Sequence, residues 1–290
     1  MTSCINCHSN ETFIFYAGIV RNSSNLEDRV MKCNKCGLVF LPSSFKELDY
    51  QSSNYRESIN EKNFTELDYH RSTLHDPGHI SNIFRGMNIN LNNLSILDFG
   101  CGPGNFLKSN KAPLKVGYDP DPEMQAFFQD DSEVSFFDDL KKLKLSYSDG
   151  FDIVISNYVI EHVDSVRGYL RSCYELCKDG GYLFISTPNL NDVLNIYAPE
   201  SFNKHFFRKQ HKWYFDIDSL STSVEHTGFK LIKSGGVHRY DFSNFVNWIS
   251  GNEIPGFSCN TLDSPELSLE WKKLLLSKNM TETIYLIGQK

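Results

Sequence analysis

The chain has 290 residues, with 29 lysines and arginines against 36 aspartates and glutamates, and a formal net charge of −7. Basic residues form no long run, which disfavours nucleic acid as a partner, because affinity for phosphates comes from clustered lysine and arginine. The length permits one large domain with a small appendage.

The N-terminus lacks the basic start and apolar run of a signal peptide, and no stretch approaches the roughly 18 apolar residues of a membrane-spanning helix. We therefore expect a cytoplasmic protein without a membrane span. In that compartment the eight cysteines remain thiols. Metal binding, packing or chemistry must then explain them before disulfides are considered.

Two Cys-x-x-Cys pairs lie near the N-terminus, Cys4 with Cys7 and Cys33 with Cys36. Two thiolates three positions apart on a tight turn can reach one ion, and two such turns complete a tetrahedral site. The spacing predicts a zinc-ribbon-like module over residues 1–42. Its zinc is expected to be structural, because four thiolates leave no open position for a catalytic water. Four free cysteines at a chance spacing are the alternative.

Residues 94–107 run from an apolar strand through a glycine-rich turn into a predicted helix, which is the first unit of a doubly wound α/β fold. Gly100, Gly102 and Gly104 let the backbone approach a ligand closely, at the carboxyl end of a strand where such sheets bind ligands. The Gly-x-Gly-x-Gly spacing differs from the dinucleotide fingerprint.

Residues 116–121 contain a second short predicted strand, which ends in Asp119. Its carboxylate is suited to accept hydrogen bonds from both hydroxyls of a ribose. A nicotinamide cofactor would also fit a glycine turn followed by such an aspartate, so an oxidoreductase stays an alternative at this point.

Two further blocks discriminate between these cofactors. Residues 151–163 carry a strand followed by Glu-His-Val, and residues 177–189 carry a Gly-Gly turn into a strand that ends in Thr-Pro-Asn. Together with Asp98 and the glycine turn, these motifs strongly resemble class I S-adenosylmethionine-dependent methyltransferases. The resemblance runs from about Leu94 to Lys290. It implies an α/β fold with a Rossmann-like seven-stranded methyltransferase sheet, mostly parallel with an antiparallel last strand.

The resemblance also implies S-adenosylmethionine as the cofactor. Asp98 would lie near its ammonium group, the three glycines would pack against its methionyl part, and Asp119 would hold its ribose. Asp138, Asp139 or Leu140 would flank the adenine. The residues assigned to the cofactor are Asp98, Gly100, Cys101, Gly102, Gly104, Asp119, Pro120, Asp138, Asp139, Asn157 and Tyr158.

An aromatic-rich stretch over residues 190–215 is predicted to form a lid, and regular patterning fades within it. An amphipathic helix is predicted over residues 218–227, and the last two strands over residues 229–233 and 283–288.

In the resembled family a short turn joins these two strands, whereas here residues 235–280 form an insertion. Residues 238–248 look like a segment of methyltransferases from bacterial sugar and surface-polysaccharide pathways. Their aromatic and hydrogen-bonding side chains suit a sugar-like small molecule. A packing hairpin is the alternative.

Methyl transfer from a sulfonium is an in-line displacement, so the enzyme aligns the reactants and removes a proton if a hydroxyl attacks. His162 is the first candidate base, because it follows the fourth strand at the carboxyl edge of the sheet, with Glu161 adjacent. His211 and Tyr214, in the lid, are the alternatives. A structural role for His162 stays open, because Glu-His-Val occurs across the family.

We expect the ribbon-like module to be followed by a helical connector covering the cofactor, residues 43–90, and a methyltransferase domain, residues 91–290. The predicted function is methylation of a small molecule, either a nucleotide-linked or polymer-bound bacterial sugar or a natural-product hydroxyl. One alternative is an RNA methyltransferase, since one ribosomal RNA family also sets a cysteine-rich module before this fold. A non-catalytic module that binds cofactor and docks a partner is another. The oligomeric state is left open.

Overall fold

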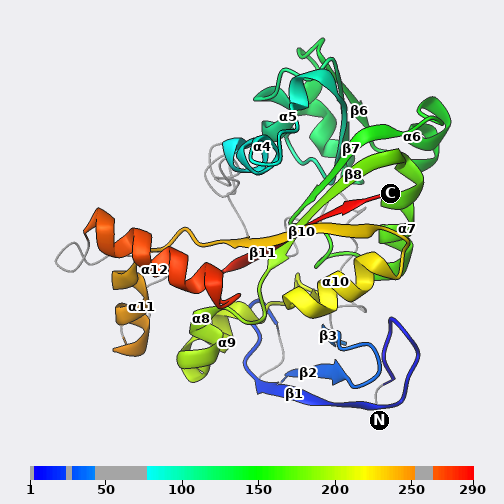
Figure 1. Ribbon diagram of the computed structural model, residues 1–290. Coiled ribbons are helices and arrows are strands. Elements are labelled where there is room, and N and C mark those ends of the chain that lie inside the picture. The colour runs from blue at the N-terminus through cyan, green and yellow to red at the C-terminus, as the bar shows by residue number, and fades with distance from the viewer. Residues whose placement is uncertain (1–2, 24–27, 43–76, 252–263) are drawn as a thin grey trace.

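A seven-stranded sheet lies at the centre of the computed structural model, which describes residues 3–23, 28–42, 77–251 and 264–290 (Figure 1). The strand order is β10-β11-β8-β7-β4-β5-β6. Neighbours from β8 to β6 pair in parallel, and β11 is antiparallel to both β8 and β10, as the sequence predicts. The strands are β4 (Ser95–Phe99), β5 (Leu114–Tyr118), β6 (Val134–Phe137), β7 (Phe151–Asn157), β8 (Cys177–Pro188), β10 (Lys230–Val237) and β11 (Thr283–Gln289).

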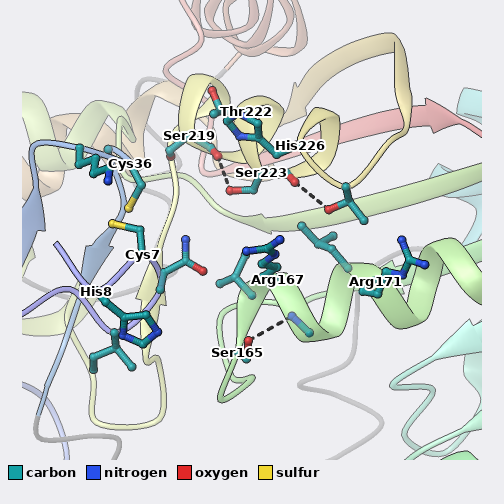
Figure 2. Close-up of a pocket in the computed structure, with 18 of the residues that line it drawn as sticks. Cys7, His8, Cys36, Ser165, Arg167, Arg171, Ser219, Thr222, Ser223 and His226 are labelled. Carbon is teal, nitrogen blue, oxygen red and sulfur yellow. Dashed lines mark hydrogen bonds between the residues drawn. The ribbon is translucent and has the colours of Figure 1, made fainter.

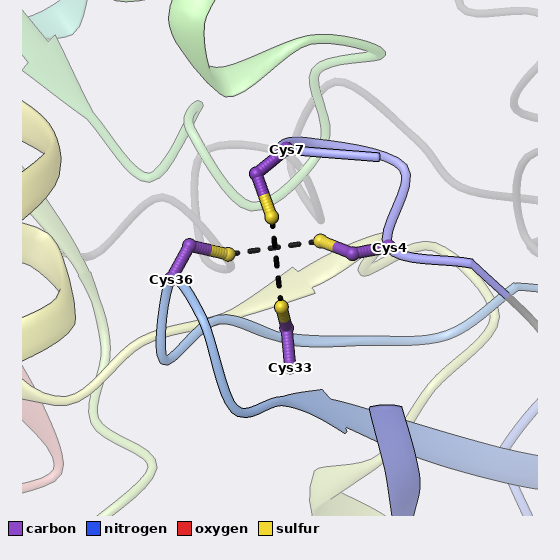
Figure 3. Close-up of side chains that lie close together, drawn as sticks. All are labelled: Cys4, Cys7, Cys33 and Cys36. Carbon is purple, nitrogen blue, oxygen red and sulfur yellow. Dashed lines mark hydrogen bonds between the residues drawn. The ribbon is translucent and has the colours of Figure 1, made fainter. Parts of the chain in front are cut away.

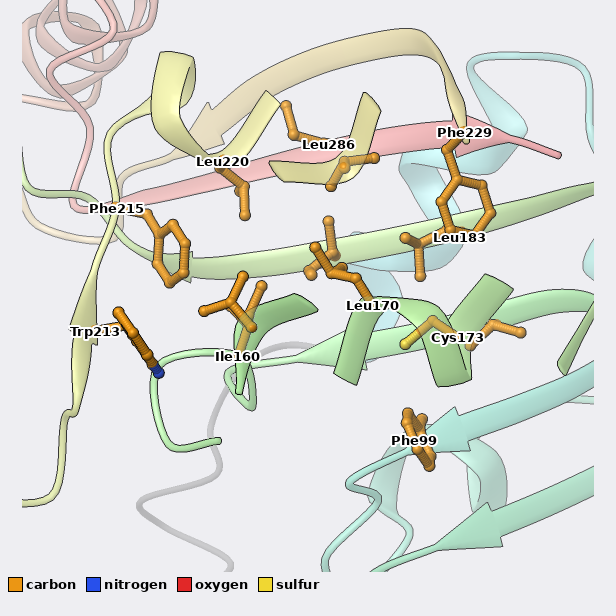
Figure 4. Packing of buried hydrophobic residues seen from close by; sticks show 14 of the residues in the cluster. Phe99, Ile160, Leu170, Cys173, Leu183, Trp213, Phe215, Leu220, Phe229 and Leu286 are labelled. Atoms are coloured by element: carbon orange, nitrogen blue, oxygen red, sulfur yellow. The ribbon is translucent and has the colours of Figure 1, made fainter. Parts of the chain in front are cut away.

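Helices cover both faces of this sheet because successive strand residues point to opposite sides. Ile96 belongs to a core formed with α4, whereas its neighbour Leu97 belongs to a core formed with α7 and α10. Figure 4 shows the second core, in which Leu170 and Leu220 meet the sheet. The helices are α4 (Pro77–Arg85), α5 (Asn105–Lys108), α6 (Leu140–Ser146), α7 (Val166–Leu176) and α10 (Ile217–Glu225), with short 3₁₀ helices at Leu91–Asn93 and Pro122–Phe128.

Local capping explains where the two main helices of that core begin. The Ser165 side chain accepts a hydrogen bond from the Gly168 amide and starts α7. Asp216 and Ser219 form a reciprocal capping box at the start of α10, close to the predicted start of this helix.

The N-terminal module and the lid share a second sheet, in the order β1-β2-β3-β9. The lid is more regular than its sequence pattern suggests, because it contains two short helices as well as β9. Val30 and Val39 of the module pack against Phe207 and Tyr214 of the lid in one apolar cluster. The elements are β1 (Thr12–Gly18), β2 (Asp28–Cys33), β3 (Val39–Phe40), α8 (Val193–Tyr197), α9 (Pro199–Phe206) and β9 (Trp213–Tyr214).

The predicted insertion differs in two respects from the sequence expectation. Strand β10 extends to Val237, so residues 235–237 belong to the sheet rather than to the insertion. The described part of the insertion then forms two helices, α11 (Phe242–Ile249) and α12 (Pro265–Ser277), whereas the alternative interpretation of this segment is a packing hairpin. Trp248 and Leu275 pack these helices against α8.

Residues 43–76 of the predicted connector lie outside the described residues, and its remainder contains α4. Among the described helices, each is too short or too polar to cross a membrane.

Candidate active site

The glycine turn lies at the carboxyl end of β4, between β5 and β7, where the chain reverses its direction of winding. Gly100, Gly102 and Gly104 have φ angles of 97°, 51° and 77°, a region that side chains disfavour. A Cβ atom at Gly100 would lie 2.4 Å from the Val159 side chain, and one at Gly104 would lie 2.5 Å from the Phe128 ring. The turn therefore requires glycine and packs directly on the segment that follows β7.

Two carboxylates flank this turn. Asp119 accepts hydrogen bonds from the Gly102 amide at 2.9 Å and from the Asp121 amide at 3.0 Å. Burial, reinforced by the charge of Asp119, raises the pKa of Asp98 to about 7. A cationic ligand would relieve this repulsion. The pair therefore suits S-adenosylmethionine, which carries an ammonium group as well as ribose hydroxyls.

The residues assigned to the adenine lie at the end of β6. Asp139 caps α6, because its carboxylate accepts hydrogen bonds from the Lys141 and Lys142 amides at 2.7 and 3.2 Å. Asp138 is exposed beside it. Burial raises the pKa of Tyr118 to about 12, and Asp119, Asp139 and Asp138 add to this shift. These acidic groups therefore lie near one another at the sheet edge.

Four other residues assigned to the cofactor surround the turn or end β7. Cys101 is buried, with its thiol donating to the Gly102 carbonyl at 3.4 Å, and Pro120 follows Asp119. Asn157 accepts a hydrogen bond from the Ser186 hydroxyl. Tyr158 has a φ of 58° and shares a hydrogen bond with the Thr283 hydroxyl.

Glu161, His162 and His211 converge on one place next to this turn. Their ligand atoms all lie within 4.8 Å of one another, although the sequence separates His211 from the other two. The two imidazole rings meet edge to face, with centroids 4.9 Å apart. Glu161 is buried, its carboxylate accepts a hydrogen bond from Thr187, and it lies 4.0 Å from Nε2 of His162.

Backbone contacts from the lid orient these groups. The Glu161 carbonyl accepts a hydrogen bond from the Lys212 amide at 2.7 Å, and the Trp213 indole donates to the Val163 carbonyl at 2.7 Å. Nδ1 of His162 lies 2.8 Å from the Gln210 carbonyl. Because a carbonyl can only accept, Nδ1 carries the proton and Nε2 is the nitrogen that accepts one.

Burial keeps both imidazoles neutral near pH 7. It lowers the pKa of His162 to about 4, lowers that of His211 well below its usual value, and raises that of Glu161 to about 7. Neutral imidazoles and a carboxylate can accept protons, and the same donor set can hold a divalent cation. The positive charge of Arg208, which also lowers the pKa of both histidines, opposes such a cation.

Tyr214, a further candidate base, forms hydrogen bonds with the lid backbone instead. Its buried hydroxyl accepts a hydrogen bond from the Arg208 amide and donates one to the Arg208 carbonyl, both at 3.0 Å. Sequence reasoning missed Arg208 altogether, because nothing in a lid without periodic patterning distinguishes it from neighbouring basic residues.

The four cysteine sulfurs of the N-terminal module point toward one centre (Figure 3). Cys4 and Cys36 lie 3.6 Å apart, and so do Cys7 and Cys33. Sulfurs at about 2.3 Å from a zinc ion form a tetrahedron with edges of about 3.8 Å, whereas a disulfide needs about 2.05 Å. The hydrogen bond from Cys4 lowers the pKa of Cys36 to about 5. The four thiols therefore fit a zinc ion.

A groove of about 1570 Å³ separates the N-terminal module from α7 and α10 (Figure 2). Cys7 and Cys36 line it, but none of the residues assigned to the cofactor or to catalysis does. The groove is therefore distinct from the candidate active site.

Comparisons with known proteins agree with this geometry. A family model described as a methyltransferase domain matches residues 64–234. A mitochondrial ubiquinone biosynthesis O-methyltransferase from Rattus norvegicus is 27% identical over 202 residues, which cover 63% of this chain and 55% of that protein. A ubiquinone biosynthesis O-methyltransferase from Nitrobacter winogradskyi is 28% identical over 155 residues, covering 50% of this chain and 59% of that protein. The chain spans about half the length of the curated relatives it matches.

Two solved structures show the same fold. A methyltransferase from Archaeoglobus fulgidus aligns with a TM-score of 0.51 at 19% identity, covering 77% of this chain and 99% of that one. One from Thermotoga maritima aligns with a TM-score of 0.50 at 18% identity, covering 77% and 95%. Because the family model matches more than half of its length, the chain belongs to the methyltransferase domain family, with the class I S-adenosylmethionine-dependent fold.

Proposed function

We propose that the protein transfers a methyl group from S-adenosylmethionine to a hydroxyl oxygen of a small molecule. The observation that carries this proposal is the convergence of Glu161, His162 and His211 beside the glycine turn. Val159, two residues before Glu161, packs on Gly100, so the cofactor turn and the proton-accepting groups adjoin.

The chain's own residues bind and orient the cofactor. S-adenosylmethionine, when bound, supplies a methyl group on a positively charged sulfur. Asp98 offers its buried carboxylate to the ammonium group, and the glycine turn leaves room for the methionyl part. Asp119 holds the turn through the Gly102 amide, and its carboxylate also suits the ribose hydroxyls.

His162 serves as the base. The Gln210 carbonyl fixes the proton on Nδ1, so Nε2 can take the proton from the attacking hydroxyl. Since burial lowers the pKa of His162 to about 4, the imidazole is neutral and ready at physiological pH. Glu161, 4.0 Å away, stabilises the imidazolium that forms. His211 packs edge-on against the ring and limits its movement.

The names of the relatives support oxygen as the attacked atom, since they are O-methyltransferases of ubiquinone biosynthesis. They do not support the sugar pathway in particular. A bacterial sugar hydroxyl stays a proposal, based on aromatic residues such as Tyr240, Phe242 and Trp271 in and around the insertion helices. A phenolic hydroxyl is the second candidate acceptor, based on the relatives' names.

A structural zinc ion completes the proposal. Cys4, Cys7, Cys33 and Cys36 would hold it, and the zinc would fold the module that pairs with β9 of the lid. The proposed location is the cytoplasm.

The test combines binding and turnover. Calorimetric titration of the zinc-quantified full chain with S-adenosylmethionine and S-adenosylhomocysteine is expected to show micromolar binding of both. Methyl transfer by the zinc-loaded protein to a nucleotide-linked sugar and to a dihydroxybenzoate is then compared, with and without added Mg²⁺. Absence of cofactor binding to the folded protein would overturn the proposal. If activity requires an added divalent cation, Glu161, His162 and His211 would bind that cation rather than accept a proton.

A further inference from the structure

Arg21 of the N-terminal module lies beside Arg208 of the lid. The two residues face each other in an isolated parallel β-bridge. The Arg21 amide donates to the Phe207 carbonyl at 2.8 Å, and the Lys209 amide donates to the Arg21 carbonyl at 3.0 Å. Two backbone hydrogen bonds therefore hold two arginines from distant parts of the chain side by side.

No acidic side chain among the described residues forms an ion pair with these two arginines, although the charge of Glu161 acts on Arg208 from a distance. Among the residues that the structure describes, neither guanidinium forms an ion pair or a side-chain hydrogen bond. Nε of Arg208 is buried without a hydrogen-bond partner. Burial, and then the charge of Arg21, lowers the pKa of Arg208. Holding two cations together in this way is costly unless an anion binds between them.

The pair adjoins the proposed acceptor site. The charge of Arg208 acts on all three converging groups: it adds to the lowering of the pKa of His162 and His211, and it offsets part of the rise that burial causes in the pKa of Glu161. Gln210, whose carbonyl orients His162, follows Arg208 by two residues. The Tyr214 hydroxyl accepts a hydrogen bond from the Arg208 amide and donates one to the Arg208 carbonyl, so the lid holds the backbone of this arginine in place.

We propose that Arg21 and Arg208 form a clamp for an anionic group, a phosphate or a carboxylate, that the methyl acceptor carries. Guanidinium groups bind both kinds of oxyanion through paired hydrogen bonds. The inference rests on the proposed methyltransferase function and narrows its acceptor to anionic small molecules. It also gives the N-terminal module a role in substrate binding, because the fold of that module delivers Arg21 to the lid.

The experiment titrates inorganic pyrophosphate and, separately, benzoate into the full-length, zinc-loaded protein at constant ionic strength. Each titration is run with and without saturating S-adenosylhomocysteine. The variants are Arg21→Gln and Arg208→Gln, and the control is Arg29→Gln, which removes an exposed arginine of β2 in the same module. Binding of pyrophosphate indicates a phosphate-bearing acceptor, and binding of benzoate indicates a carboxylate-bearing one.

We expect the wild type and Arg29→Gln to bind at least one anion equally, and each clamp variant to bind it about tenfold more weakly or worse. S-adenosylhomocysteine affinity should be unchanged in all of them. Equal anion affinity in Arg21→Gln and wild type, or no binding of either anion by the wild type, would overturn the clamp. Because Arg21 is exposed, Arg21→Gln should fold and can test the clamp even if Arg208→Gln does not fold. If the wild type does not bind S-adenosylhomocysteine, the proposed function is contradicted rather than the clamp. The anion titrations without S-adenosylhomocysteine still test the clamp in that case.

Discussion

Replacement of Glu161 by glutamine should stabilise the fold at high pH far more than at low pH. Burial raises the pKa of this carboxyl from 4.5 to about 7, and at about 1.4 kcal/mol per unit its ionisation costs the folded state about 3 kcal/mol. Because the pKa is higher in the folded state, ionisation of Glu161 destabilises the fold only above the unfolded pKa near 4.5. The cost grows as pH rises and is complete above pH 7. Between pH 5 and pH 8 the penalty grows by about 2 to 3 kcal/mol, and Glu161→Gln should remove this dependence.

The assay is urea unfolding of the zinc-loaded wild type and Glu161→Gln at pH 5 and pH 8, without cofactor and without added divalent cation, so that the cysteine-bound zinc stays in place and no added cation holds the carboxylate. Thr187 can still hydrogen-bond to the amide, so the variant keeps its local contact. Glu225→Gln, an exposed glutamate of α10, serves as the control. A stability difference between wild type and Glu161→Gln that is the same at both pH values would refute the reasoning. It would mean that the carboxylate is paired or hydrated in the folded state.

Three further predictions concern the cofactor, the base and the zinc. His162→Ala should slow methyl transfer by about 10²- to 10⁴-fold with cofactor affinity unchanged, and a mild effect in steady-state kinetics would remove it as the base. Asp119→Ala should weaken cofactor binding by about 1–3 kcal/mol, because it strands the Gly102 amide and the ribose hydroxyls, and unchanged calorimetric affinity would contradict that role. Cys36→Ser, or chelation of the wild type, should increase hydrogen exchange first in β1 to β3 and then in β9; uniform exchange would argue against a structural metal.

Short-range features of the chain were sufficient to predict the sheet and the cofactor turn. The glycines at 100, 102 and 104 adopt the left-handed backbone that their spacing implies. Each Cys-x-x-Cys turn needs only local chain geometry, and the antiparallel pairing of β1 with β2 brings the sulfurs of the two turns together as predicted. Asp119 ends up beside the glycine turn because parallel strands present their carboxyl ends at one edge.

Tertiary structure alone decided how the lid completes the site. The sequence singled out His162 and His211 separately, but their contact depends on the Gln210 carbonyl and on hydrogen bonds between the lid and Glu161. The partnership of Arg21 with Arg208 joins segments far apart in the chain through a single bridge, which leaves no periodic signal in either segment. Periodicity reports burial along one element, whereas such contacts depend on how several elements pack together. Local sequence patterns were therefore enough to predict the fold and the glycine turn, whereas the packing of the lid on the N-terminal module sets which side chains line the proposed acceptor site.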